Sequence, residues 1–181
     1  MHRKNILNLL QEYLVQHKDE ENITKRFIKF VEENSECFNR TLLKGHLTGS
    51  AWLLNKNRTH VLLTHHKKLN KWLQLGGHAD GDSDILNVAI KEVEEESGLT
   101  DLTMISNGIF DLDAHLIPAR KDEPEHYHYD VRFAFVTNGN ENYIVSNESF
   151  DLQWIKLDDI TKKTSEKSIL RMLNKTSNLP V

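Results

Sequence analysis

The residues best suited to chemistry are three glutamates spaced for one face of a helix. Glu92, Glu95 and Glu96 lie three and four positions apart, and helical residues advance about 100° each, so the three side chains point the same way. Like charges this close repel one another unless a cation lies among them. Carboxylate oxygens suit a hard divalent ion, Mg²⁺ or Mn²⁺. The spacing therefore predicts a divalent-cation site, against the plainer alternative of a solvated acidic face.

Glycines on both sides of the acidic run favour the cation site. Gly98 follows the run at the point where a left-handed residue would end the helix. Gly76 and Gly77 precede it across a loop rich in Asp and Gly, and glycine lets a backbone approach a ligand closely. The same helix carries a separate apolar stripe that can bury it: Leu86, Ile90 and Val93.

The segment from Gly77 to Leu99 resembles the Nudix box. That pattern is Gly, five residues, Glu, seven residues, then Arg-Glu-apolar-x-Glu-Glu-x-Gly-apolar. The positions that match at the required spacing are Gly77, Glu92, Val93, Glu95, Glu96, Gly98 and Leu99. Two positions depart: Ser83, flanked by Asp82 and Asp84, replaces a Glu, and Lys91 replaces an Arg. That Glu and Arg commonly support each other in the family. We therefore expect one local rearrangement, in which Lys91 keeps the charge without the bidentate fork.

The resemblance implies an α/β fold, a Nudix-type α/β/α sandwich with a mixed sheet. It also implies hydrolysis of a phosphoanhydride (diphosphate) bond with Mg²⁺ or Mn²⁺. Carried over by position, Glu95 and Glu96 are the implied metal ligands, and Glu92 is a metal ligand or the general base. A backbone carbonyl at Gly76 or Gly77 often adds a ligand. Some members take the base from a downstream loop, and the candidates here are Glu123, Glu125, Glu141 and Glu148.

The likeness continues beyond the box, over residues 46–82, 110–135 and 150–160. Those segments are similar to a bacterial Nudix subgroup that has an N-terminal helical extension and no assigned substrate. On this reading residues 1–37 form the extension. Residues 38–181 form the Nudix domain, with its box at 77–99.

Hydrophobic periodicity gives the expected elements. Residues 3–17 and 23–34 carry helical apolar stripes. We expect an N-terminal helical hairpin that packs on the main domain, although a dimer contact or a substrate lid stays open. A closing helix is expected at 164–174. The predicted strands are 46–55, 59–66, 71–75, 102–116, 125–137, 143–145 and 152–156.

A second polar constellation lies on two of these strands. Because strand side chains alternate, one face of one strand carries His126, His128, Asp130 and Arg132. One face of another carries Asp111, Asp113 and His115. If the strands pair, this surface is a solvated polar face, a substrate-binding surface, or a transition-metal site formed by His126, His128 and Asp130. His78 and Asp80 could complete any of these sites. Phosphate contacts are expected from Lys71, Arg120 and Arg132, whose plain alternative is ordinary surface charge.

Composition limits the other functions. The 181 residues are 38% hydrophobic and 28% charged, as in a soluble globular protein. The net charge of −4 argues against general nucleic-acid binding. The single cysteine, Cys37, excludes an internal disulfide. Without an apolar run of membrane-spanning length or a signal-peptide core, no membrane partner is expected and the cytoplasm is the expected compartment. The expected partner is a small-molecule diphosphate, with a homodimer left open.

Three rival functions remain. A Nudix-fold protein could bind a nucleotide or sugar nucleotide without cleaving it, and Ser83 and Lys91 keep that alternative open. An isopentenyl-diphosphate isomerase is disfavoured because its chemistry resembles proton transfer by a Cys and a Glu, and no Cys lies near the box. A zinc-ribbon NADH pyrophosphatase is disfavoured because the cysteine pairs are missing. The substrate itself is not readable from the sequence.

Overall fold

The computed structural model describes residues 2–120 and 124–180. Within these residues an eight-stranded mixed sheet has the order β3-β2-β1-β7-β5, with β4 pairing β1, β6 pairing β7 and β8 pairing β2. The central pair, β1 and β7, is parallel. The strands are β1 (Gly45–Leu54), β2 (His60–His66), β3 (Lys71–Leu73), β4 (Leu75–His78), β5 (Leu102–Met104), β6 (Asp111–Ile117), β7 (His126–Thr137) and β8 (Ser149–Lys156).

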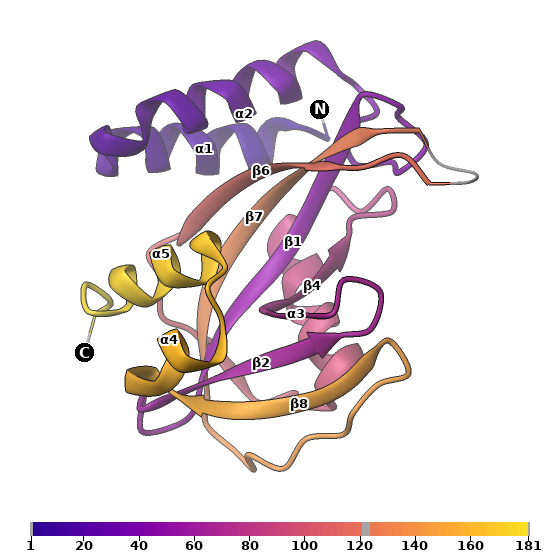
Figure 1. Ribbon diagram of the computed structural model, residues 1–181. Helices are drawn as coiled ribbons and strands as arrows, with labels where there is room; N and C mark the ends of the chain where they lie inside the picture. The colour runs from indigo at the N-terminus through magenta and orange to yellow at the C-terminus, as the bar shows by residue number, and fades with distance from the viewer. Residues whose placement is uncertain (1, 121–123, 181) are drawn as a thin grey trace.

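Helices cover both faces of this sheet (Figure 1). On one face α3 (Ile85–Ser97) packs on β1 so closely that a Cβ at Gly49 would lie 2.8 Å from the Ile85 carbonyl oxygen. On the other lie α4 (Ile160–Lys163) and α5 (Lys167–Thr176), and Trp52 of β1 donates a 2.9 Å hydrogen bond to Thr176. The expected α/β/α sandwich with a mixed sheet is confirmed.

The N-terminal helical hairpin is also confirmed, as α1 (Lys4–Gln16) and α2 (Glu21–Glu33) joined by the short 3₁₀ turn η1 (Lys18–Glu20). Phe27 and Phe30 of α2 pack on Tyr129 of β7, and their ring centroids lie 5.2 and 3.8 Å from that of Tyr129. The apolar sides of both helices thereby join the core cluster that also holds the buried residues of α3. None of the described helices is both long and apolar enough to cross a membrane.

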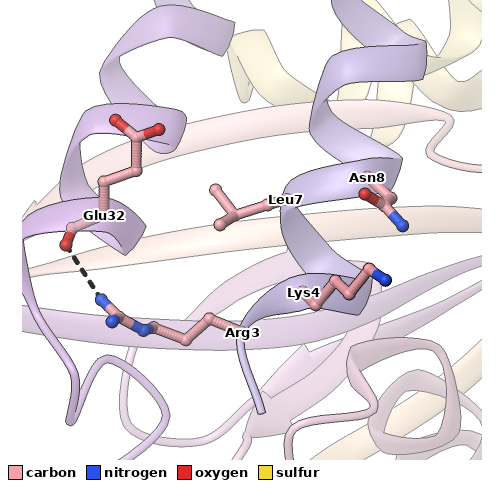
Figure 2. Close-up of a pocket in the computed structure, with 5 residues that line it drawn as sticks. All are labelled: Arg3, Lys4, Leu7, Asn8 and Glu32. Carbon is pink, nitrogen blue, oxygen red and sulfur yellow. Dashed lines mark hydrogen bonds between the residues drawn. The ribbon is translucent and has the colours of Figure 1, made fainter. Parts of the chain in front are cut away.

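A surface cavity of about 380 Å³ opens between the two hairpin helices (Figure 2). Its wall includes Arg3, which donates hydrogen bonds to the carbonyl oxygens of Val31 and Glu32 at 2.7 and 2.9 Å. The lining residues are Arg3, Lys4, Leu7, Asn8 and Glu32. None of the candidate site residues from the sequence lies among them.

Two expected strands differ in the structure. The run expected at 102–116 is interrupted between β5 and β6, because Gly108 adopts a positive φ of 84° and its carbonyl accepts a 2.8 Å hydrogen bond from Ser106. The strand expected at 143–145 is wrong. Instead of pairing with a strand, Ile144 donates its N–H to the Ser97 carbonyl at 2.8 Å, at the end of α3.

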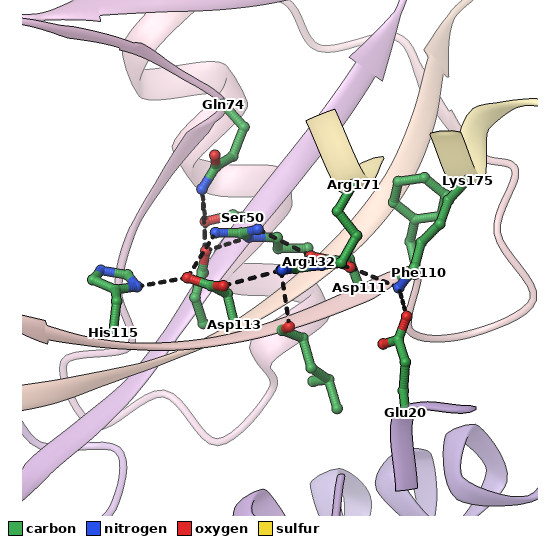
Figure 3. A network of polar contacts seen from close by, with 12 residues as sticks. Glu20, Ser50, Gln74, Phe110, Asp111, Asp113, His115, Arg132, Arg171 and Lys175 are labelled. Carbon is green, nitrogen blue, oxygen red and sulfur yellow. Dashed lines mark hydrogen bonds and ion pairs between the residues drawn. The ribbon is translucent and has the colours of Figure 1, made fainter. Parts of the chain in front are cut away.

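A buried ion network joins the hairpin to the sheet and to α5 (Figure 3). At its centre Asp111, 0% exposed, pairs with Arg132 at 3.0 Å, Arg171 at 2.8 Å and Lys175 at 2.6 Å. Lys175 in turn pairs with Glu20 of η1 at 2.5 Å. Burial opposes ionisation of Asp111, but the hydrogen bond from Arg171 and the charges of Arg132 and Lys175 outweigh it and lower the pKa. One carboxylate thus connects four elements.

Replacing Asp111 by alanine should destabilise the fold strongly, because it leaves three cations without their shared buried partner. We expect a loss of about 3–5 kcal/mol in the free energy of unfolding, measured by urea denaturation. Asp159→Ala is the matched control, since it removes an exposed carboxylate paired with Lys162, and it should leave stability close to the wild-type value. Equal stability of the two variants would contradict the role given to this network.

Candidate divalent-cation site

The acidic helix forms as the sequence predicted. Asp84 caps its N-terminus by accepting a 3.2 Å hydrogen bond from the Asn87 N–H. Gly98 ends it in the left-handed conformation, with φ of 74°. Of the predicted apolar stripe, Val93 is buried and Leu86 and Ile90 are partly buried, and Val88 and Ala89 complete the buried side. This packing places the acidic face beside the glycine turn of β4.

Two of the glutamates lie directly against the backbone of that turn. The Glu96 carboxylate accepts a 2.8 Å hydrogen bond from the Gly76 N–H. A Cβ at Gly77 would lie 2.3–2.6 Å from the carboxylate atoms of Glu92, so a side chain there would occupy the space that the carboxylate fills. The double glycine therefore lets two acidic groups and a strand share one small volume.

Negative charge on the glutamates of this cluster is unfavourable unless a cation lies nearby. Burial, then the charges of Glu95 and Glu148, raise the pKa of Glu92 to about 7. Burial also raises the pKa of Glu96 to about 8. The hydrogen bond from the Gly76 N–H lowers this pKa, while the charges of Glu92, Glu148 and Glu95 raise it further. The Glu95 side chain is exposed at the edge of the cluster. Half-buried carboxylate oxygens that ionise with difficulty are a suitable donor set for a hard dication.

The two departures from the Nudix pattern are explained by one local contact. Lys91 pairs with Asp82 at 3.1 Å, so Asp82 supplies the carboxylate that Ser83 lacks. The Asp82 carboxylate also accepts hydrogen bonds from the Asp84 N–H at 2.9 Å and from Asn87 at 3.1 Å. The Asp84 N–H and Lys91 together lower its pKa. The loop before the helix is therefore held by the carboxylate of Asp82, one position before the place where the Nudix pattern has its Glu.

The second constellation assembles partly as expected. β6 and β7 pair so that Asp113 lies opposite Asp130 and His115 opposite His128, which puts both polar faces on one side. However, Asp130 is already saturated, because it accepts hydrogen bonds from Arg132, Ser50, Thr48 and Gln74 at 2.7–3.1 Å. Arg132 is only 2% exposed and pairs with Asp130 at 2.7 Å. Both residues therefore face the buried ion network rather than an open surface.

The histidines gather around a residue that the sequence did not single out. Potential ligand atoms of His46, His78 and His128 lie within 4.8 Å of one another. His46 is 2% exposed, and neither of its ring nitrogens has a hydrogen-bond partner among the described residues. Burial, then the neighbouring imidazoles, lower the pKa of His46 to about 4 and that of His128 to about 2. His46 was missed because only the parallel pairing of β1 with β7 sets it opposite His128.

Other candidates lie around these two groups. Lys71 pairs with Glu166 at 2.9 Å, and Asp80 pairs with Arg40. Among the possible loop bases, Glu148 is the one whose charge acts on both Glu92 and Glu96. Of the other candidates, Glu125 lies just before β7 and Glu141 accepts a 3.1 Å hydrogen bond from the Lys56 N–H, while Glu123 lies outside the described residues.

Comparison with known proteins agrees with this fold. The NUDIX domain family model matches residues 45–174. A NUDIX-family hydrolase from Clostridium perfringens aligns with a TM-score of 0.58 at 24% identity, covering 74% of this chain and 97% of that one. The E. coli dihydroneopterin triphosphate pyrophosphohydrolase aligns at 0.58 and 13% identity, covering 71% and 92%. A C. elegans Ap4A hydrolase aligns at 0.53 and 19% identity, covering 73% and 95%. A search of curated proteins gave no match.

Replacing Glu96 by glutamine should stabilise the metal-free protein at alkaline pH. The pKa of Glu96 rises from 4.5 to about 8 on folding, so the folded state keeps a proton that the unfolded state loses, and stability falls as pH rises between these values. At about pH 8 with a chelator the variant should gain about 1–3 kcal/mol, discounted for partial exposure. At about pH 4, below both pKa values, the gain should nearly vanish.

Thermal unfolding at both pH values measures this difference. Glu94→Gln is the matched control, because Glu94 is exposed on the opposite side of the same helix and should show little pH-dependent gain. A gain for Glu96→Gln that is the same at both pH values would contradict the proposed protonation.

Proposed function

The chain belongs to the Nudix family, and from this premise we propose that it is a Mg²⁺- or Mn²⁺-dependent pyrophosphohydrolase. Its substrate would be a nucleoside diphosphate derivative or a related small molecule with a phosphoanhydride bond. The observation that carries the proposal is the position of Glu92 and Glu96 against the backbone of Gly76 and Gly77. The pKa values of both glutamates are raised at this position. This favours a site that binds a dication over an acidic helix face that is simply solvated.

The residues that would hold the metal are Glu95 and Glu96, with Glu92 as a further ligand or as the general base. A backbone carbonyl at Gly76 or Gly77 is the proposed additional ligand. When bound, the ion would offset charge on the diphosphate oxygens and make a water molecule more acidic. The Gly76 N–H contributes independently of the ion, because it fixes the Glu96 carboxylate at 2.8 Å.

Hydrolysis joins a water oxygen to one phosphorus and breaks the bond from that phosphorus to the bridging oxygen. The leaving phosphate takes the electron pair of the broken bond, and a carboxylate takes the proton released by the water. Two side chains are proposed for that last role. Glu92 has a pKa of about 7, close to the value that general-base catalysis favours. Glu148 lies in the loop just before β8, and its charge contributes to the raised pKa of Glu92 and Glu96.

Replacing Glu96 by glutamine should abolish most of the hydrolytic activity. The variant keeps side-chain shape but removes a proposed metal-ligand charge, and we expect turnover with Mg²⁺ to fall by roughly 10²–10⁴. The assay is release of phosphate-containing products from nucleoside triphosphates, dinucleoside polyphosphates, ADP-ribose and sugar nucleotides, with Mg²⁺ and Mn²⁺ compared. Glu94→Gln should retain activity.

Two outcomes would count against this proposal. Unchanged turnover in Glu96→Gln would remove that residue from the mechanism. Tight binding of a nucleotide by the wild-type chain without any product release would favour the alternative function, a non-catalytic nucleotide or sugar-nucleotide binder.

Glu148→Gln tests the choice of general base. If Glu148 accepts the proton, kcat should fall by about 10²-fold while affinity for Mg²⁺ stays near the wild-type value, because Glu148 is not among the proposed ligands. Glu141→Gln is the control, since Glu141 lies in the same loop region but contacts Lys56. A kcat equal to that of the wild type would leave Glu92 as the base.

A further inference from the structure

We propose that His46, His78 and His128 form a second metal site, for a transition dication of the zinc class. It lies where one end of each of three strands meets: the start of β1, the end of β4 and the start of β7. It is separate from the carboxylate cluster on α3. Imidazole nitrogens suit Zn²⁺ and similar ions, whereas Mg²⁺ prefers oxygen ligands.

The geometry of the three rings fits a shared ion. Their potential ligand atoms lie within 4.8 Å of one another, and the ring centroids are 4.8–5.0 Å apart. Tetrahedral zinc with Zn–N bonds of about 2.0–2.1 Å holds its nitrogens roughly 3.4 Å apart. Small side-chain rotations would therefore bring the three nitrogens to the required spacing without movement of the strands.

His46 supplies the observation that points to a ligand. It is 2% exposed, yet neither Nδ1 nor Nε2 has a hydrogen-bond partner among the described residues. A buried polar nitrogen without a partner costs about 1–3 kcal/mol, and such groups are rare in folded proteins. A metal ion bound to one nitrogen would replace the missing interaction.

His126 borders this group through His128 and is the nearest candidate for a fourth ligand, although only the other three have ligand atoms that all lie within 4.8 Å of one another. Its Nδ1 lies 2.9 Å from the Pro124 carbonyl oxygen, a contact that places the ring proton on Nδ1 because a carbonyl can only accept. Its Nε2 is then free of a proton and lies 3.3 Å from Nε2 of His128. This separation equals the edge of a tetrahedral zinc site, and the carbonyl contact resembles the outer contacts that orient metal-bound histidines.

The site shares the glycine turn with the carboxylates but lies on its other side. Side chains alternate along a strand, so position 77 faces Glu92 while His78 points the opposite way, toward His46 and His128. A metal bound to His78 would therefore fix the end of β4 and, with it, the turn against which Glu92 and Glu96 lie. We assign the site this positioning role.

The test uses the untagged full-length chain, because a histidine tag would bind the same ions. After chelator treatment and dialysis, Zn²⁺ is titrated against a competing chromophoric chelator, and thermal unfolding is followed with and without Zn²⁺. The wild type should bind about one ion per chain at these nitrogens and unfold at a higher temperature with Zn²⁺. With Co²⁺ it should give the visible absorption of a tetrahedral nitrogen-ligated ion.

His46→Phe separates a ligand from a packing residue. It removes both unpartnered nitrogens and keeps an aromatic ring, so the metal-free variant should be at least as stable as the wild type, while stabilisation by Zn²⁺ disappears. His78→Gln, at a less buried position, gives a second variant if the first folds poorly. Each should weaken Zn²⁺ binding by roughly 100-fold or more, above the effect of losing an outer contact.

Two control variants make the result specific. His60→Gln removes a histidine of β2 that contacts Thr59 and should leave Zn²⁺ affinity unchanged. Glu96→Gln should also leave it unchanged, so failure of the carboxylate site and failure of this site remain distinguishable. The proposal is overturned if the wild type binds Zn²⁺ no more tightly than His46→Phe, or if His60→Gln weakens binding as much as His78→Gln. It is also overturned if inorganic phosphate, and not Zn²⁺, stabilises the wild type.

Discussion

Close contact between the acidic helix and a glycine turn sets the geometry of the whole candidate site. Glu92 and Glu96 rest on backbone that has no side chains at Gly76 and Gly77, and α3 approaches β1 over Gly49 at a distance that excludes a Cβ. Burial against this surface raises the pKa of both glutamates. The helix can carry this unfavourable charge because its other side is packed into the core. Binding of a dication would remove the electrostatic cost that the packing imposes.

The sheet separates two kinds of polar chemistry. On the α3 side lie carboxylates short of positive charge, which suit a hard ion. On the other side lie imidazoles and a buried network in which each carboxylate has a cation near it. β1 and β4 are common to both sides, and the alternation of side chains along them keeps the groups apart. Each side can therefore hold its own charge pattern within a few residues of chain.

The N-terminal hairpin is tied to this arrangement by both packing and charge. Aromatic residues of α2 pack on Tyr129 of β7, and Glu20 of η1 pairs with Lys175, which pairs with Asp111. β7 also carries His128 and Asp130, so the strand beneath the hairpin is the one that bears the second polar group. The hairpin thus packs on one of the two central strands, and its buried residues share a core cluster with those of α3.

The sequence by itself determined the acidic helix, its ending at Gly98, the double glycine before it and the faces of the polar strands. Each of these is local, since helical and strand periodicities and glycine conformation depend on residues within a few positions. The sequence also indicated that the two departures from the Nudix pattern, at Ser83 and Lys91, would form one local rearrangement. The ion pair between Asp82 and Lys91 agrees with this expectation.

Only the tertiary structure decided partners. Thr48 and Asp130 are 82 positions apart and hydrogen-bonded. This contact and three other hydrogen bonds occupy the Asp130 carboxylate, so it is not a ligand beside the histidines. His46 entered the cluster because β1 and β7 pair in parallel. Periodicity tells which way a side chain points within its own strand. Which strand lies beside it depends on packing of the whole core, and no local sequence pattern contains that information.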